Sequence, residues 1–277
     1  YGETFQPGDR VQSYLSEVVM TNRGPEIRLS RTSPLFLVKL FNIEVPEIAD
    51  GTIQIKAAAR EPGHRAKIAV YTADRDIDPV GACVGMKGSR VQNIVNEMQG
   101  EKIDIVRWSE DHESFAKAAL APAEITSIMS NYEDRILDVI VDDAQLSLAI
   151  GKRGQNVRLA AMLTGWKINI ISKSKLQVKL SAAVMNLVQL KSVTESLAQV
   201  LVQLGIMSIV DLSASEASDL SKMAGITLDL AKTIVAEAST AIESGSVKSE
   251  PEEDEEVISA SAVPHAREAY YQPNSSS

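Results

Sequence analysis

The sequence predicts an α+β fold in which one small unit occurs twice, between a short β-rich segment and an all-helical module. Two observations carry this prediction. Glycine loops of the form G-x-x-G stand at residues 85–88 and 151–154, and each is followed by apolar residues at helical spacing and then by a β-branched run. From residue 180 onward only helical patterns follow, up to an acidic tail. A repeat on the scale of a domain is more specific than either loop alone.

Residues 1–33 are expected to be the C-terminal part of an OB-fold barrel. Strand patterns at residues 11–15 and 26–30 flank the turn signal N-R-G-P. Two or three strands do not close a stable barrel, and the chain starts at Tyr1 rather than Met. We therefore expect a fragment or a processed product that lacks the first half of the barrel. Tyr14 either stacks on a nucleic-acid base or points into a core.

Residues 34–108 form the first predicted unit. A helix is expected at residues 34–46, where Pro34 suits the first turn, and strands at residues 53–57, 66–72 and 102–106. Three cations make the hairpin between the first two strands basic, namely Arg60, Arg65 and Lys67. Cys83 is the single cysteine. It is expected in the core, and the absence of a possible disulfide within the chain indicates a reducing compartment.

Residues 109–178 repeat the same order of elements. A helix at residues 113–119, a weakly marked strand at 124–130 and a strand at 137–142 precede the second glycine loop, and a strand at 167–171 follows it. Both units therefore read α-β-β-α-loop-α-β. The connection between them has only four residues, 109–112. Since it spans at most about 14 Å, the two units must touch.

The last two segments differ from the rest in charge. Residues 179–245 are expected to be helical, and the pattern at residues 223–238 resembles a helix-hairpin-helix. This segment is acidic, so protein contact or simple packing is favoured over nucleic-acid binding. Residues 246–277 are expected to be a disordered acidic tail, because six acids fall within residues 250–256 and repel one another.

Composition restricts the function classes. The formal net charge of the 277 residues is -9, but residues 1–180 are neutral overall, and the excess acids all lie after them. No apolar run is long enough to span a membrane and no secretory signal is visible, so a cytoplasmic protein is expected. The three histidines, His64, His112 and His265, show no ligand or triad spacing. Neither a metal, a cofactor nor a catalytic residue is therefore predicted.

The two glycine loops are the candidate binding site. Residues 144–180 contain seven Lys or Arg and no Asp or Glu. Glycine has no Cβ, so a phosphate can approach the main chain closely, and the amides of a following helix add donors. A single G-x-x-G is most often an ordinary turn, but the second copy favours a nucleic-acid clamp.

The motifs also carry a family resemblance. Five phrases show it most clearly: RTSP at residues 31–34, PVGACVG at 79–85, EKIDIV at 101–106, ALAPAE at 119–124 and AIGKRGQNVRLA at 149–160. The two units resemble KH domains of the bacterial type II topology, whose GXXG loop clamps about four nucleotides of single-stranded RNA. A truncated barrel of the S-one type, two KH units and an acidic helical module together are similar to the NusA family of bacterial transcription elongation and termination factors.

The resemblance implies a function and a set of contacts. The full-length protein would bind the nascent transcript as a monomer, act with RNA polymerase and other transcription factors, and regulate pausing, termination and antitermination. By motif position, the residues that contact RNA would be Gly85, Met86, Lys87, Gly88, Ser89 and Arg90 in the first unit, and Gly151, Lys152, Arg153, Gly154, Gln155, Asn156 and Arg158 in the second. The polymerase-binding domain of the family is absent from this chain.

Two other classes remain as alternatives. A KH-containing RNA-processing enzyme such as polynucleotide phosphorylase has a single KH unit followed by its barrel, whereas here the barrel segment comes first and the KH unit is doubled. Ribosome-assembly RNA-binding proteins are typically strongly basic, and this chain is not. The RNA sequence that is bound, the native N-terminus and the partner of the acidic module cannot be read from the sequence.

Overall fold

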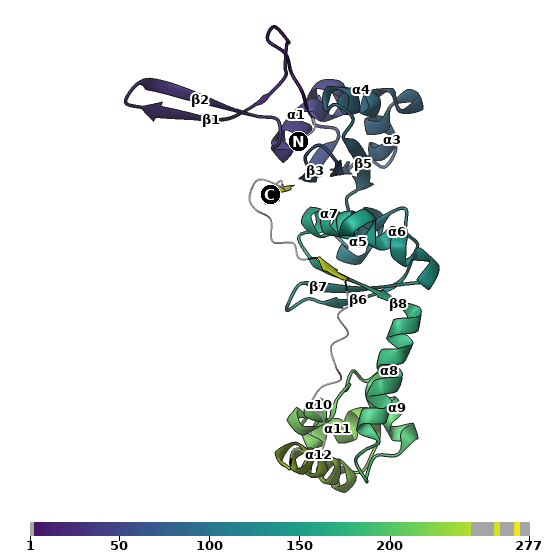
Figure 1. Ribbon diagram of the computed structural model, residues 1–277. Coiled ribbons are helices and arrows are strands. Elements are labelled where there is room, and N and C mark those ends of the chain that lie inside the picture. Colours follow the sequence, from purple (N-terminus) through teal and green to yellow (C-terminus); the bar gives the residue numbers. More distant parts are fainter. Residues whose placement is uncertain (1–2, 245–257, 261–268, 272–277) are drawn as a thin grey trace. The chain divides into compact units, whose positions relative to one another are not determined.

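A computed structural model describes residues 3–244, 258–260 and 269–271 (Figure 1). The described residues fall into two compact units, one within residues 1–170 and 258–277 and the other within residues 171–257. Helices and strands are mixed in the compact unit that contains residues 1–170, and the other compact unit is helical. The predicted α+β class is confirmed.

A two-stranded antiparallel hairpin opens the described chain. Strand β1 (Tyr14–Thr21) pairs with β2 (Gly24–Ser30) across a two-residue turn. More than half of the side-chain surface is exposed in a set of apolar residues from both strands: Leu15, Val18, Met20, Ile27 and Leu29. Such a hairpin is what a piece of a larger barrel would present. Tyr14 packs against the core of the first KH unit, which favours the second of its two predicted roles.

The first KH unit follows the predicted order of elements. Its elements are α1 (Pro34–Glu44), α2 (Pro46–Ala49), β3 (Gln54–Glu61), β4 (Arg65–Tyr71), α3 (Pro79–Val84), α4 (Ser89–Glu97) and β5 (Lys102–Arg107). Strand β3 runs antiparallel to β4, and β4 runs parallel to β5. The helix expected at residues 34–46 ends at Glu44, because the residue before Pro46 takes an extended conformation.

The predicted basic hairpin is neutralised inside the fold. Arg60 is 2% exposed and pairs with Glu101, whose carboxylate lies 2.6 Å from Nε. Arg60 Nη1 also donates to the carbonyls of Arg31 and Ser33. Lys67, 1% exposed, donates to Asp104 over 3.0 Å. Buried charges of this kind require partners, so none of these groups is left for a ligand.

Asp104 binds a second cation as well, because Arg65 donates to both of its carboxylate oxygens. Burial by itself raises the pKa of Asp104, but the hydrogen bonds and charges of Arg65 and Lys67 outweigh it and hold the pKa below its ordinary value. Cys83 lies in the same core, as predicted, and burial raises the pKa of its thiol to about 12.

The second KH unit has the same topology. Its elements are α5 (His112–Leu120), β6 (Ile125–Asn131), β7 (Ile136–Val141), α6 (Leu146–Ile150), α7 (Gln155–Thr164) and β8 (Lys167–Ser172). The strands are ordered β6-β7-β8, with the helices against one face of the sheet (Figure 1). The weakly marked strand at residues 124–130 is therefore present as β6.

The two KH units share one hydrophobic core, so they do touch, as the short connection requires. Ala57, Ala59 and Val106 of the first unit belong to the same buried cluster as Phe115 and Leu159 of the second. All five of these side chains are exposed by 4% or less, although they come from different units. The junction is thus a packed interface rather than a flexible joint.

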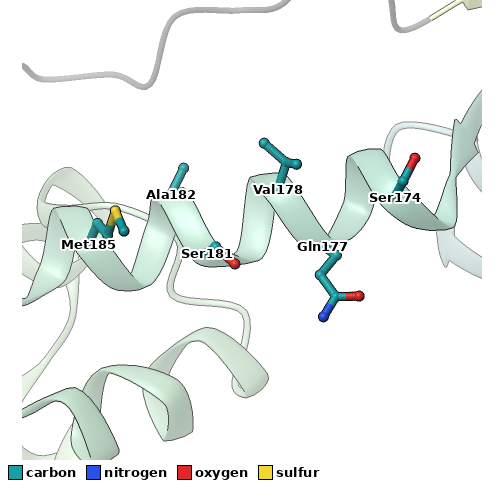
Figure 2. A pocket seen from close by; sticks show the side chains of 6 residues that line it. All are labelled: Ser174, Gln177, Val178, Ser181, Ala182 and Met185. Carbon is teal, nitrogen blue, oxygen red and sulfur yellow. The ribbon is translucent and has the colours of Figure 1, made fainter.

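The helical unit has a core of its own. It contains α8 (Lys173–Leu187), α9 (Glu195–Gln203), α10 (Ile209–Ala214), α11 (Ala217–Ala224) and α12 (Leu228–Glu243). Gly225 has a φ of 66° and ends α11 before α12 begins, so a turn between two helices lies where the sequence predicts one. Along α8, Ser174, Val178, Ala182 and their neighbours line a shallow, mostly apolar hollow (Figure 2).

The prediction of a wholly disordered tail is wrong for two short strands. Strand β9 (Ile258–Ala260) pairs with β8, and β10 (Ala269–Tyr271) pairs with β3, both antiparallel. The rest of the predicted tail, residues 246–257, 261–268 and 272–277, lies outside the described residues. Among the described helices, none is long and apolar enough to cross a membrane.

Candidate nucleic-acid interface

The two glycine loops have almost the same backbone. Gly85 has φ 76° and ψ 173°, and Gly151 has φ 73° and ψ 172°. The third loop residues, Lys87 and Arg153, are both left-handed, with φ of 52° and 55°. A left-handed backbone is uncommon outside glycine and often marks a functional turn. The sequence repeat therefore extends to a repeated loop geometry.

Each loop exposes its positive side chains. Lys87, Lys152 and Arg153 are exposed, and Met86 is 87% exposed. Within the described part of the chain, no carboxylate forms an ion pair with any of these three cations. Ser89 is exposed as well. These side chains are therefore available to an anionic ligand that approaches the loops.

Each loop also leads into the N-terminus of a helix. Gly88 precedes α4 and Gly154 precedes α7, and neither cap provides a side-chain acceptor for the first amides of its helix. The first amide of each helix donates within its own loop, from Ser89 to the Met86 carbonyl and from Gln155 to the Lys152 carbonyl. The positive end of the helix dipole still favours a phosphate or another anion. The arrangement thus supplies a positive dipole end and mobile positive charges.

Asn156 was predicted to contact RNA, but the structure places its side chain inside the protein. It is 6% exposed, and its Nδ2 donates to the carbonyls of Leu120, Leu148 and Ala149 at 3.0–3.2 Å. A Cβ at Gly151 would lie 2.7 Å from the Cβ of Asn156. Asn156 therefore holds the end of α6 against the start of α7 and shapes the loop from within.

Three further predicted contacts are engaged by protein groups. Arg90 donates to both carboxylate oxygens of Glu47, at 2.9 and 3.2 Å, and to the Ala82 carbonyl. Gln155 and Arg158 both donate to the carboxylate of Glu61 in the first unit. Arg158 is still about half exposed, at 47%. These side chains orient the loops, and only Arg158 also faces solvent to a large extent.

Glu61 was not found from the sequence, where it reads as an ordinary residue of a hairpin. Its carboxylate is only 19% exposed and receives Gln155 Nε2 at 2.7 Å. It thus ties the first turn of α7, directly after the second loop, to strand β3 of the first unit. No periodicity or motif in one sequence indicates such a contact between units.

A groove of about 560 Å³ runs beside the second loop. It is lined by Ile150, Gly151, Arg153, Gly154, Val157 and Arg158 on the KH unit, and by Ser259 and Ala260 of β9. Sequence reasoning missed the last two residues because it assigned them to a disordered tail. The signal that could have found them is the short run V-I-S-A-S-A-V at residues 257–263, which is apolar and alternating within polar sequence.

The described residues offer no other site of comparable chemistry. No group of three or more His, Cys, Asp or Glu side chains among them is placed to hold a metal ion. The hollow along α8 (Figure 2) is lined by small, apolar and amide side chains, without a charged group. The glycine loops therefore remain the candidate interface for a polyanion.

Comparison with known proteins agrees with this geometry. Residues 31–108 match the model of a NusA-like first KH domain, and residues 112–178 match that of a NusA-like second KH domain. The chain is 57% identical over 172 residues to the transcription termination/antitermination protein NusA of Bacillus subtilis and 56% identical over 175 residues to that of Halalkalibacterium halodurans. It is 46% identical over 241 residues to that of Rickettsia conorii.

These alignments cover 62%, 63% and 84% of this chain, but only 46%, 46% and 48% of the three relatives. The chain therefore spans about half the length of the curated relatives that it matches. Both KH models match in the order in which the structure shows the two units. With its tandem NusA-type KH units and its close relatives, the chain belongs to the NusA family.

Proposed function

We propose that this chain is the RNA-binding part of a bacterial transcription factor, and that it binds single-stranded nascent RNA through its two glycine loops. The observation that carries the proposal is the duplicated loop geometry, in which two G-x-x-G turns share their backbone angles and expose Lys87, Lys152 and Arg153. KH domains use this kind of loop to clamp about four nucleotides.

The contacts have a simple physical basis. A phosphate lies against the main chain at Gly154, where even an added Cβ would meet no atom within 4 Å, and faces the positive end of the α7 dipole. Lys152 and Arg153 add charge that neutralises further phosphates. Loop cations fix the RNA backbone, while base identity is read by main-chain edges and neighbouring side chains. The first loop contacts RNA in the same way, through Gly85, Met86, Lys87, Gly88 and Ser89.

The shared core makes the two loops parts of one binding surface. Because Ala57 and Ala59 are buried in one cluster with Phe115, binding of RNA at one loop brings the adjacent stretch to the other at high effective concentration. A long RNA is therefore bound more tightly than an oligonucleotide that spans one loop.

In the full-length protein, the chain acts with RNA polymerase and other transcription factors. The relatives are named for transcription termination and antitermination, and an RNA-binding segment would deliver their regulatory effect by holding the transcript. This role needs no catalytic residue, metal or cofactor, and the chain acts as a monomer in the cytoplasm.

Glycine-to-aspartate substitution tests the proposal. Gly154→Asp places a carboxylate where a phosphate approaches, and no atom lies within 4 Å of the added Cβ, so the fold should survive. We expect RNA affinity to fall by about 1–3 kcal/mol, the scale of a lost charge-assisted contact. Gly205→Asp is the matched control, because Gly205 also has a positive φ and open space but lies in the helical unit.

Binding is measured by fluorescence anisotropy with a labelled, unstructured RNA, and the fold by circular-dichroism melting. Gly205→Asp should bind as the unchanged chain does. Equal affinity of the Gly154→Asp and Gly205→Asp variants, both with intact melts, would rule out the second loop as an RNA site.

A further inference from the structure

Strand β9 occupies the edge of the second KH sheet. In the described sheet the strands are ordered β6-β7-β8-β9, so β8 would be an edge strand without β9. The pairing is antiparallel, with Ala260 opposite Ile168, Ser259 opposite Asn169 and Ile258 opposite Ile170. An open strand edge presents unpaired N–H and C=O groups and is a template for an added strand.

A side chain of β9 fixes this pairing in addition to the backbone. Ala260 is 8% exposed and belongs to the hydrophobic cluster of the second unit, together with Val157 and Ile168. Ser259, which alternates with it, is exposed. An apolar side chain directed inward and a polar one directed outward are the pattern of a strand that belongs to a sheet.

The same strand forms one wall of the groove beside the second glycine loop. Gly151, Arg153 and Gly154 line the groove together with Ser259 and Ala260 of β9. The groove adjoins the loop, so nucleotides held by the loop would lie next to β9. A peptide strand seated on β8 takes up space that the RNA needs.

We propose that the β8 edge beside the second glycine loop is a strand-addition site for an extended peptide, that residues 258–260 of this chain are its occupant, and that peptide and RNA exclude each other there. The exclusion rests on the proposed RNA-binding function, whereas the strand addition stands on the pairing alone. Main-chain hydrogen bonds supply the affinity in this mode of peptide recognition, and pockets for alternate side chains supply the specificity.

The occupant is a strand and not merely a negative charge. Residues 258–260 read Ile-Ser-Ala and carry no charge, although six acids lie just before them in the sequence. Three residue pairs are few, so the contact is reversible, and attachment to the same chain raises the effective concentration of the strand. A site that is nine-tenths occupied lowers the apparent RNA affinity about tenfold.

Ser259→Pro tests the idea in the full chain without a change of charge. Proline removes a backbone N–H and fixes φ, which disfavours a paired strand. Ser259→Ala keeps the N–H and a freely variable φ, and it serves as the matched control. Hydrogen exchange at the β8 amides that face β9, which are alternate residues within 168–170, reports the strand addition directly, with no RNA present. We expect faster exchange in the proline variant only.

RNA binding is then measured for the same variants at low and high salt. Ser259→Pro should raise the affinity about tenfold at both salt concentrations, because no charge has changed. A synthetic peptide of residues 254–264, added to the proline variant, should displace RNA. A charge-neutralised chain with glutamine at residues 252, 253, 255 and 256 should keep the slow exchange, and any gain in affinity there should vanish with salt.

Each outcome decides one part. Unchanged exchange at β8 in the proline variant would overturn the strand addition. Faster exchange with unchanged RNA affinity would overturn the exclusion and leave the peptide site. If neither the unchanged chain nor any variant binds RNA, the proposed RNA-binding function fails and the exclusion falls with it, while the exchange data still decide whether the edge binds the strand.

Discussion

The two glycines of the second loop should respond very differently to alanine. A Cβ at Gly151 would lie 2.7 Å from Asn156 Cβ and 2.8 Å from its main-chain nitrogen, whereas a Cβ at Gly154 meets nothing within 4 Å. Gly151 also has φ 73° and ψ 172°, a region that is essentially restricted to glycine. Gly154 is left-handed, with φ 72° and ψ 12°.

These contacts set the size of the effect. Backbone strain at Gly151 costs about 1–3 kcal/mol, and the overlap with main-chain atoms adds about 1–3 kcal/mol, because the start of α7 must move. We therefore expect Gly151→Ala to lower the free energy of unfolding of the second KH unit by roughly 2–6 kcal/mol. Gly154→Ala should cost only about 1–2 kcal/mol, the ordinary cost of a left-handed residue.

Urea unfolding measures this difference when it is followed by the fluorescence of Trp166. This side chain is 6% exposed in the second unit, and a Trp108→Phe background removes the other tryptophan. Gly85→Ala offers a comparison in the first loop. The three atoms nearest to its Cβ would be side-chain atoms of Arg90 rather than main-chain atoms, so its clash should cost less. Unfolding free energies of Gly151→Ala and Gly154→Ala that agree within about 0.5 kcal/mol would refute the argument, because independent surface changes rarely exceed that value.

Three further outcomes follow from the charges. Replacing Lys152 and Arg153 with Gln should flatten the slope of log affinity against log salt by about 1.4, at 0.7 per lost phosphate contact, and Arg158→Gln should flatten it less; equal slopes for all variants would contradict the phosphate contacts. A double-mutant cycle of Glu61→Gln and Arg158→Gln, read by urea unfolding, should give a coupling energy of only about 0.5–1 kcal/mol, because the arginine is half exposed; strict additivity would show that the pair does not connect the units. Asp104→Asn should destabilise the first unit by about 3 kcal/mol, since it leaves a buried lysine unpaired. Because the pKa of Asp104 is lowered in the fold, the stability that its carboxylate contributes is present at neutral pH and is lost as the pH falls below about 4. The Asp104→Asn variant should therefore lose less stability than the unchanged chain over that acid range. Parallel pH profiles of unfolding free energy would exclude a stabilising role for the Asp104 carboxylate.

Local patterns were sufficient to predict the order of elements and the two loops. The spacing of apolar residues after each G-x-x-G predicts α4 and α7, and β-branched runs predict β5 and β8. The helix break before Pro46 was missed, although the restriction on the residue before a proline was available as a signal. The prediction that the units touch followed from the length of their connection alone.

The roles of individual polar side chains could not be predicted in the same way. Asn156 follows the loop in sequence and has the chemistry of a base-reading residue, yet it turns inward to three carbonyls. Arg158 and Gln155 face Glu61, a residue more than ninety positions away in sequence. Such contacts depend on how one KH unit packs on the other, and this packing cannot be predicted from a single sequence.

The buried arginine of β3 has a mechanical consequence. Arg60 donates hydrogen bonds to the carbonyls of Arg31 and Ser33, which lie between the hairpin and α1, and to the carboxylate of Glu101. A displacement of the hairpin is therefore transmitted to the sheet of the first KH unit through hydrogen bonds, and not only through the covalent connection at residues 31–33. This one guanidinium therefore couples the hairpin mechanically to the first KH unit.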